Sequence, residues 1–253
     1  MGRLALIWDG VWLTWTTFDS SETVGRREIS RQDMIPEVLR ALRNQVGAGA
    51  QVCHAEWARP ASAIPLAMLP DHPTKESWEP LHAMHHGRLT DGAVLTGHTL
   101  TSLSNDVLLA VSGDQAWQEA VEGVFPQHRH LPLVHVLVHD AVQWNRRSSG
   151  DAWTFRVDVR GHGAVMVALA GEEVQWVHHL SRLGSAEDAL YAMVNAAHRA
   201  GVDVNACRAL WSGESDWTLG WDRFMEVHPA LDMVQKTPAD SWWPLLNSMG
   251  ECA

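Results

Sequence analysis

Lysine, cysteine and tyrosine are scarce in this chain of 253 residues, which has two lysines, three cysteines and one tyrosine. Only 19 residues are lysine or arginine against 30 acidic residues, so the formal net charge is −11. A surface that binds nucleic acid needs clustered lysine and arginine to neutralise phosphates, and an anionic membrane attracts the same side chains. The composition therefore argues against DNA, RNA or a membrane surface as a partner.

The three cysteines, Cys53, Cys207 and Cys252, are too few and too far apart for a disulfide framework, and no CxxC pair suggests a zinc site. The start of the chain lacks a basic-then-apolar signal region, and no run of about 18 apolar residues occurs. These absences predict a protein of the reducing cytoplasm that is neither secreted nor membrane-spanning.

Common catalytic motifs are also missing. The chain contains no GxSxG, no GxxxxGK[ST] and no GxGxxG. Tryptophan is abundant instead, with 14 residues against four phenylalanines. Most are expected to fill core and sheet-face positions. The late tryptophans are candidates for an exposed contact surface: Trp217, Trp221, Trp242 and Trp243.

Two parts of the chain share one order of predicted elements. Residues 3–30 read as three strands separated by polar turns, followed by a helix over 33–46 and a strand over 50–57. Residues 152–183 again read as three strands, followed by a helix over 185–199 and a strand over 206–213. The repeat predicts an α/β protein with mixed α+β sheets, built as two related lobes around a cleft. Because a meander followed by a helix is common in α+β proteins, a chance match is the alternative.

We expect the first lobe to span residues 1–148 and the second 149–253, with the polar stretch 147–151 as linker. The middle of the chain is less regular. The prolines within residues 59–73 predict loops and broken turns there. A short helix is expected over 74–86, interrupted at Pro80. Two strands are expected within 91–112, an amphipathic helix opened by Asp114, and an apolar helix that continues through residue 145.

This pattern resembles the actin-like superfamily, which includes Hsp70 proteins and sugar kinases. More specifically, nearly the whole chain is similar to a bacterial domain-of-unknown-function family, number 3822. The similar parts are the opening hairpin, "SAIPLAML" (62–69), residues 152–180 and the run from "SAEDALYAMVNAAHRAGVD" to "LWSGE". The resemblance implies an actin-like ATPase fold of RNase H-like type, but it implies no established activity.

In that superfamily, Asp-x-Gly-type turns in the two hairpins hold phosphate, and a glycine-rich strand end lies beside the adenine. The matching positions here are candidates for nucleotide binding: Asp9, Gly10, Asp158, Gly161, Gly163 and Gly213. The chain departs from the pattern. Bulky Val11 and Trp12 follow the first turn, Arg160 and His162 interrupt the second, and Glu214 follows Gly213.

These departures predict a degenerate nucleotide site with no cofactor, in which Asp9-Gly10 is a type I′ hairpin turn. The leading hypothesis is a non-catalytic cytosolic interaction or scaffold protein with an unknown protein partner. The alternative is an ATPase or kinase that binds Mg-ATP between the lobes, with Asp9 and Asp158 around Mg²⁺ and the glycines allowing close backbone approach.

Histidine suggests a third hypothesis, a metal-dependent hydrolase. His135 and His139 are four residues apart on a predicted helix, with Asp140 beside them. This spacing suits two ligands of one metal ion. However, the HExxH arrangement is absent and no third ligand is evident, so we expect these histidines to be ordinary core or surface residues.

Overall fold

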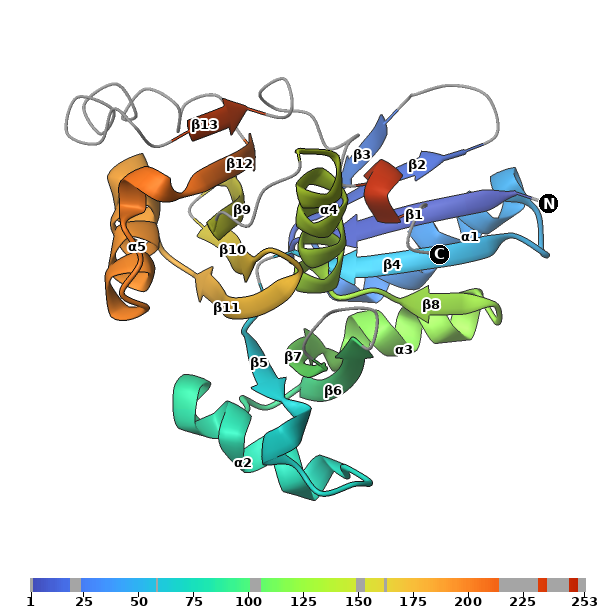
Figure 1. Ribbon diagram of the computed structural model, residues 1–253. Helices are drawn as coiled ribbons and strands as arrows, with labels where there is room; N and C mark the ends of the chain where they lie inside the picture. Colours follow the sequence, from blue (N-terminus) through green and yellow to red (C-terminus); the bar gives the residue numbers. More distant parts are fainter. Residues whose placement is uncertain are drawn as a thin grey trace.

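The computed structural model describes residues 2–18, 24–57, 59–100, 106–148, 153–161, 163–213, 232–235 and 246–249. Within these ranges the chain forms two five-stranded mixed sheets and one three-stranded sheet, with helices packed on their faces (Figure 1). The late tryptophans, His162 and Glu214 lie outside the described residues, as does most of the expected linker.

The first lobe is built on the sheet β3-β2-β1-β4-β8. Strands β1 (Arg3–Trp8), β2 (Trp12–Thr17) and β3 (Val24–Glu28) are antiparallel, whereas β4 (Gln51–Glu56) and β8 (His128–His130) run parallel to β1. Helices α1 (Ile35–Val46) and α3 (Gln115–Val124) share a core with one face of the sheet. Because both faces are covered, β1 and β4 are buried at every position after the first rather than at alternate positions, and β1 is a continuous apolar run.

The second lobe repeats this order in the sheet β11-β10-β9-β12-β13. Strands β9 (Trp153–Arg160), β10 (Gly163–Ala170) and β11 (Glu173–Leu180) are antiparallel, whereas β12 (Arg208–Gly213) and β13 (Asp232–Gln235) run parallel to β9. Helix α5 (Ala186–Arg199) covers one face and starts at a capping box formed by Ser185 and Asp188. The predicted architectural repeat and the mixed α/β fold class are confirmed.

A third sheet, β5-β7-β6, is inserted between β4 and α3. It contains β5 (Ala61–Pro65), β6 (Ala93–Leu100) and β7 (Val107–Asp114), with α2 (Lys75–His86) packed against it. We refer to residues Ala61–Asp114 as the insert, which projects from the two lobes in Figure 1.

Two expectations for the insert are wrong. The proline-rich stretch contains a strand, because β5 is an edge strand paired only with β7, and an edge tolerates Pro65 at its end. Helix α2 continues through Pro80. The helix loses one backbone hydrogen bond there, but Trp78 and His82 on its other face are buried and hold it in place.

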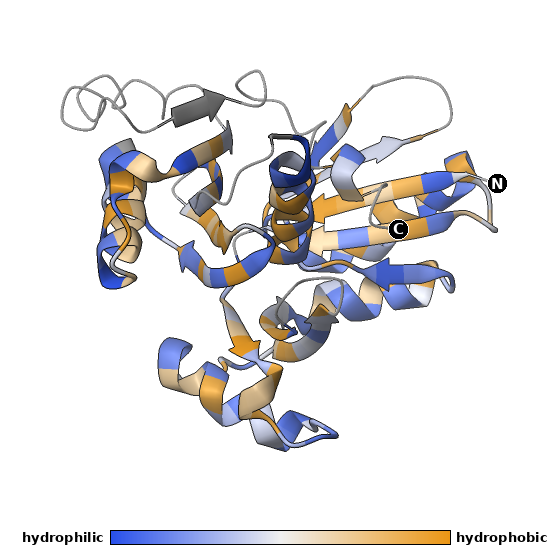
Figure 2. Ribbon diagram, viewed as in Figure 1, coloured by the Kyte–Doolittle hydropathy of each residue, from blue (hydrophilic) through white to orange (hydrophobic). Residues whose placement is uncertain are grey.

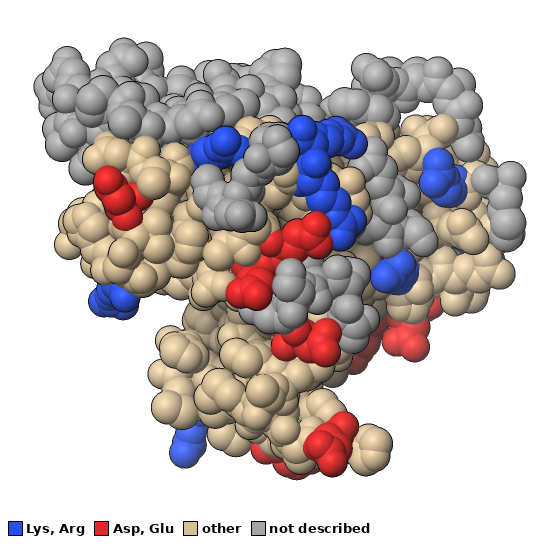
Figure 3. Space-filling view, viewed as in Figure 1, with Lys and Arg blue, Asp and Glu red and all other residues tan. Residues whose placement is uncertain are grey.

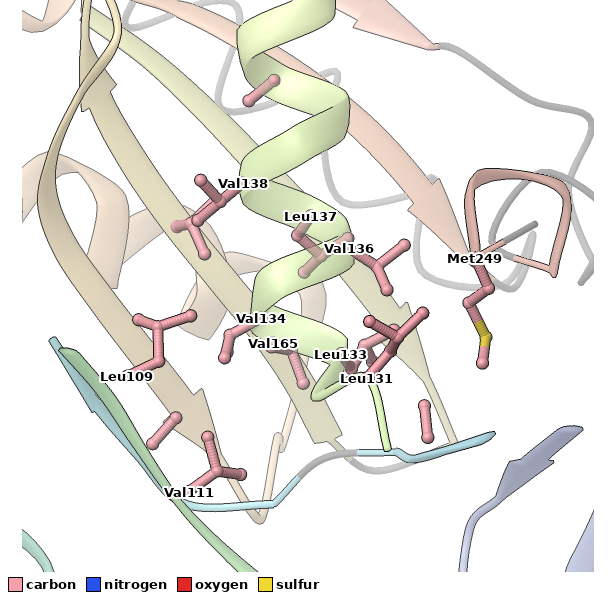
Figure 4. Packing of buried hydrophobic residues seen from close by; sticks show 14 of the residues in the cluster. Leu109, Val111, Leu131, Leu133, Val134, Val136, Leu137, Val138, Val165 and Met249 are labelled. Atoms are coloured by element: carbon pink, nitrogen blue, oxygen red, sulfur yellow. The ribbon is translucent and has the colours of Figure 1, made fainter. Parts of the chain in front are cut away.

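Helix α4 (Leu133–Ser148) lies at the centre of the molecule, and Figure 2 shows hydrophobic residues along most of it, interspersed with hydrophilic ones, and a hydrophilic upper end. The cluster around it includes Ala5 and Ile7 of β1, Val165 of β10, and Leu109 and Val111 of β7. Figure 4 shows Leu109 and Val165 on either side of Val134 of the helix. Both lobes and the insert therefore share one core.

Candidate functional site

The first predicted turn joins β1 to β2. The carboxylate of Asp9 accepts hydrogen bonds from the backbone N–H groups of Val11 at 2.9 Å and Trp12 at 2.6 Å. The backbone N–H of Asp9 donates to the carbonyl of Trp12 at 3.2 Å, which closes the hairpin. Gly10 has φ +98°, a conformation that favours glycine, and a Cβ atom there would meet nothing within 4 Å. The turn itself therefore accounts for both residues.

An arginine from the same sheet lies beside this turn. The guanidinium of Arg26 on β3 is 4.0 Å from the Asp9 carboxylate and lies over the Trp12 ring, 4.6 Å from its centroid. Arg26 is partly exposed, so the attraction to Asp9 is screened by solvent. The site nevertheless contains a basic side chain and an indole next to its first aspartate.

The second predicted aspartate, Asp158, has no exposed surface. Arg160 donates to both carboxylate oxygens, from Nε to Oδ1 at 2.8 Å and from Nη2 to Oδ2 at 3.1 Å. The hydroxyl of Ser212 donates to Oδ2 at 2.6 Å, and the indole N–H of Trp57 donates to Oδ1 at 2.8 Å. Although burial alone would raise the pKa of Asp158, the charges of Arg160 and Arg156 and the hydrogen bonds from Arg160 and Ser212 hold it below its usual value.

Asp158 belongs to a polar face of β9 that is buried against α4. Alternate residues point to the same side of a strand, and all four on this side are polar and at most 2% exposed: Thr154, Arg156, Asp158 and Arg160. Thr154 donates to Asn145 of α4 at 2.8 Å, and Arg156 donates to Asp140 of α4 at 2.7 Å. This face therefore fixes the position of α4 on the second lobe.

Arg156 also connects the two ends of this network. Its Nη1 donates to the Ser212 hydroxyl at 2.8 Å and to the carbonyl of Val157 at 2.7 Å. Burial lowers the pKa of Arg156 to about 10, so the guanidinium is still charged at neutral pH. Two arginines, two aspartates and Ser212 thus form one buried network of charges that balance each other.

Trp57 links the two lobes at this point. It directly follows β4, and its backbone N–H donates to the carbonyl of Trp8 at 2.8 Å, beside the Asp9 turn. Its side chain reaches Asp158 of the second lobe. A Cβ atom at Gly163 would lie 3.0 Å from the Trp57 ring and 3.0 Å from the carbonyl oxygen of Leu180. Gly163 thus leaves room for the indole.

The other two predicted glycines also have local explanations. Gly161 has φ +53° in the β9–β10 turn. Gly213 has φ +138°, and a Cβ atom there would lie 1.8 Å from the carbonyl oxygen of Val159 on the neighbouring strand. Close approach of two backbones requires this glycine, whether or not a ligand binds nearby.

The structure therefore places Asp158, Gly161, Gly163 and Gly213 at the carboxyl ends of β9 and β12, and Asp9 and Gly10 at the carboxyl end of β1. Trp57 lies between the two groups. Sequence reasoning missed Trp57, Arg156 and Asp140 as part of the site. The signal in the sequence was the alternation of polar residues along "TFRVDVR" (154–160), which are buried although they are polar.

In the described ranges, no three side chains of His, Cys, Asp or Glu converge as ligands of a metal ion. Asp140 is instead paired with Arg156. Cys53 and Cys207 are buried free thiols. Among these same ranges, no helix is long and apolar enough to cross a membrane.

The two repeated five-stranded sheets with their helices form an actin-like ATPase fold, and comparison with solved structures supports this fold class. A Bacteroides thetaiotaomicron protein described as having an actin-like ATPase fold and unknown function matches with a TM-score of 0.78 at 12% identity, over 98% of this chain and 95% of that one. At this identity the likeness shows the fold alone.

Two further structures match less closely. The PilM–PilN type IV pilus biogenesis complex matches with a TM-score of 0.53 at 13% identity, over 92% of this chain and 88% of that one. The cytoplasmic domain of EpsL, an inner-membrane component of the Vibrio cholerae type II secretion system, matches with a TM-score of 0.51 at 11% identity, over 100% and 96%. No family model and no curated protein matches the sequence.

Proposed function

We propose that this chain is a non-catalytic interaction or scaffold protein in which the actin-like fold is kept and the nucleotide site is degenerate. One observation carries the proposal. Both oxygens of the fully buried Asp158 accept hydrogen bonds from Arg160, and Ser212 and Trp57 donate to them as well. A carboxylate engaged in this way is not available to Mg²⁺.

The first turn supports the same proposal. Its aspartate accepts two backbone N–H groups of its own hairpin and lies near Arg26. In a phosphate-binding turn, such N–H groups would point toward the ligand instead. These residues do not suit Mg-ATP.

Two of the structural relatives supply a precedent for an interaction role. PilM is found in a complex with PilN, and EpsL is a component of a secretion system. We propose that this chain likewise serves in a protein assembly, that it is cytoplasmic, and that it belongs to the uncharacterised bacterial family number 3822.

The surface charges favour a protein partner over nucleic acid. On the face shown in Figure 3, basic side chains gather near the upper end of α4, with acidic side chains directly beside them. Arg146 in the last turn of α4 pairs with Glu172 at 2.8 Å. A phosphate backbone would meet acidic groups next to the basic ones.

Thermal unfolding with millimolar Mg-ATP tests the proposal. A ligand at 100 times its Kd stabilises the native state by about 2.7 kcal/mol, or about 5–10 °C in a chain of this size. We expect the Tm with Mg-ATP to equal the Tm with Mg²⁺ alone. A shift of several degrees that is lost in both Asp9→Asn and Asp158→Asn would instead show that Mg-ATP binds at this site, as the ATPase or kinase hypothesis requires.

Crosslinking in the native cell, followed by mass spectrometry of the purified chain, tests the interaction role. We expect one protein to be crosslinked repeatedly to the same surface residues. Recovery of only the uncrosslinked chain at native expression levels would contradict a scaffold function.

A further inference from the structure

Histidines are concentrated where the insert meets the rest of the molecule. The first histidine cluster comprises His54, His98, His128, His130 and His135. The second histidine cluster comprises His82, His86, His178 and His179. Each cluster combines histidines of the insert with histidines of a lobe or of α4, so each spans a boundary of the insert.

The first cluster joins the insert to the first lobe. The ring of His98, on β6 of the insert, lies 5.2 Å from the ring of His130 on β8. The His130 ring in turn lies 5.0 Å from that of His54 on β4, and His128 is 5.5 Å from His54. His135 at the start of α4 is close enough to His98 for repulsion between them to lower the pKa of His135. Four elements therefore contribute imidazole rings to one small volume.

Within the described residues, these imidazoles have few partners for a positive charge. His54 is 1% exposed, and neither of its ring nitrogens has a hydrogen-bond partner. Helix α3 contributes the edge of the Trp117 ring, 6.0 Å away. On β4, Glu56 lies two residues along the strand, but its carboxylate already accepts from Arg59, Gln118 and the backbone N–H of Asp114.

Two further titratable neighbours among the described residues are basic: His139, which acts on His135, and Arg129. Arg129 on β8 acts on both His98 and His135 and disfavours their protonation. Burial is the largest cause of the low pKa values, with repulsion between the histidines added to it. The pKa is about 3 for His130, about 4 for His98 and His135, and well below the usual value for His54.

The second cluster joins the insert to the second lobe, where β5 packs against β11. His82 of α2 lies between the hydroxyls of Ser62 and Ser112, both at 3.0 Å, and its ring is 4.7 Å from that of His86. His86 is close enough to His178 and His179 of β11 to lower their pKa values, although burial is the larger cause. Arg59 also acts on His179 and further disfavours its protonation, although its guanidinium is paired with Glu56 and Asp114.

We propose that the two histidine clusters form an acid-sensitive joint, in which protonation releases the insert from both lobes and exposes its side of the shared core, while the cores beneath α1, α3 and α5 persist. Charging several adjacent buried imidazoles is unfavourable while the insert is docked, and release gives each of them water. The insert keeps a core of its own after release, formed by Ile64, Trp78, Leu95, Leu108 and Ala110. The proposal goes beyond the proposed function and does not depend on it.

Hydrogen exchange of the full-length protein between pH 7.5 and 5.5 tests this joint. Below pH 6.5, the opening equilibrium of the insert should rise about tenfold per pH unit for each histidine that gains a proton on release. After correction for intrinsic exchange, we expect this rise in amides of residues 61–100 and not in α5 or β12. If both regions open in step at every pH, the acid effect is global unfolding and the proposal is wrong.

Variants in each cluster make the test specific. His54→Phe with His130→Phe keeps two aromatic rings and removes two titrating groups, so the rise should lose about two factors of ten per pH unit. His179→Gln is a single change in the second cluster and should reduce the rise by about one factor of ten per pH unit. It keeps the test informative if the double variant does not fold. His72→Gln is the control, because His72 is exposed and outside both clusters. A wild-type rise in folded variants of both clusters would overturn the proposal.

Discussion

Trp57 occupies a position that no hydrophobic residue of similar size could fill in the same way. Its ring packs beside Gly163, while its indole N–H satisfies a buried carboxylate of the other lobe. A buried acceptor that loses a donor pays the cost of its own desolvation, and a charged acceptor pays more. The side chain therefore combines packing and charge compensation at the contact between the lobes.

Trp57→Phe separates these two contributions. The phenyl ring keeps most of the packing and removes the hydrogen bond to Asp158, so we expect a loss of about 1.5–3 kcal/mol in the free energy of unfolding. Urea denaturation measures it. Trp12→Phe is the matched control, because the Trp12 ring is half-buried and its described contact is with Arg26. Equal losses in the two variants would contradict the assigned role of the hydrogen bond.

Gly213 and Gly171 provide a second comparison at the residue scale. Both have positive φ, but a Cβ atom at Gly213 would lie 1.8 Å from the carbonyl oxygen of Val159, whereas one at Gly171 would meet nothing within 4 Å. Gly171→Ala should cost about 1 kcal/mol from backbone strain alone. Gly213→Ala should cost several times as much, because the β9–β12 pairing must separate. Similar Tm values for the two variants would show that the strands accommodate the methyl group.

At the scale of elements, α4 is held to the second lobe by two different surfaces. One is the apolar cluster that includes Val165, Val167 and Leu169 of β10. The other is the polar face of β9, where Asp140 and Asn145 of the helix meet Arg156 and Thr154. Apolar contact alone would allow the helix to slide, whereas paired polar groups have one register in which all are satisfied.

A double-mutant cycle on Asp140 and Arg156 measures this polar contact. Asp140→Leu or Arg156→Met leaves a buried charge with fewer partners, so each should cost about 3–5 kcal/mol. The double variant should cost much less than the sum, because neither charge remains. The control cycle uses Arg146→Ala and Glu172→Ala, whose pair is exposed and should show little coupling. Additive losses at Asp140 and Arg156 would contradict the pairing.

The elements that sequence analysis predicted well are those with a strong local signal. Asp114 opens α3 by accepting hydrogen bonds from the backbone N–H groups of Ala116 and Trp117, as its position before an amphipathic stretch suggested. The errors arose in the insert, where proline was expected to prevent a strand and to interrupt a helix. The structure there depends on non-local contacts: β5 pairs with β7, and Trp78 and His82 of α2 are buried. A short stretch of sequence does not show such contacts.

For the whole molecule, the repeat of two lobes was predictable because each begins with a hairpin of apolar strands. The site was predictable only in part. Asp9 and Asp158 were found by analogy between the two turns, but Trp57 is 101 residues from its partner Asp158. Such a contact follows from how the lobes pack on α4, not from either motif. The assignment of the six residues as a nucleotide site stays a prediction.

The stability of the whole molecule should depend on pH with a defined sign. Histidines with a native pKa near 3–4 bind protons below pH 6.5 only when the chain unfolds, so stability is complete above 6.5 and falls toward 4. Each contributes up to about 1.4 kcal/mol per pH unit in this window. Because the native pKa of Asp158 is lowered, its contribution to stability is lost only as the pH falls below the usual aspartate pKa, which is below the window of the histidines. Urea denaturation at pH 7.5 and 5.5 should therefore show a large loss, and equal values would refute the native pKa values.

The central position of α4 has a consequence for biosynthesis. The helix is translated before β9 and β10, so its apolar side chains and Asp140 have no second-lobe partner until the chain has been made to about residue 170. A nascent first lobe on the ribosome therefore displays the uncovered apolar face of α4 that later meets the second lobe, and such exposed apolar surface attracts chaperones and aggregates readily. Stop codons shortly after residue 148 should for this reason produce insoluble fragments rather than an independent half.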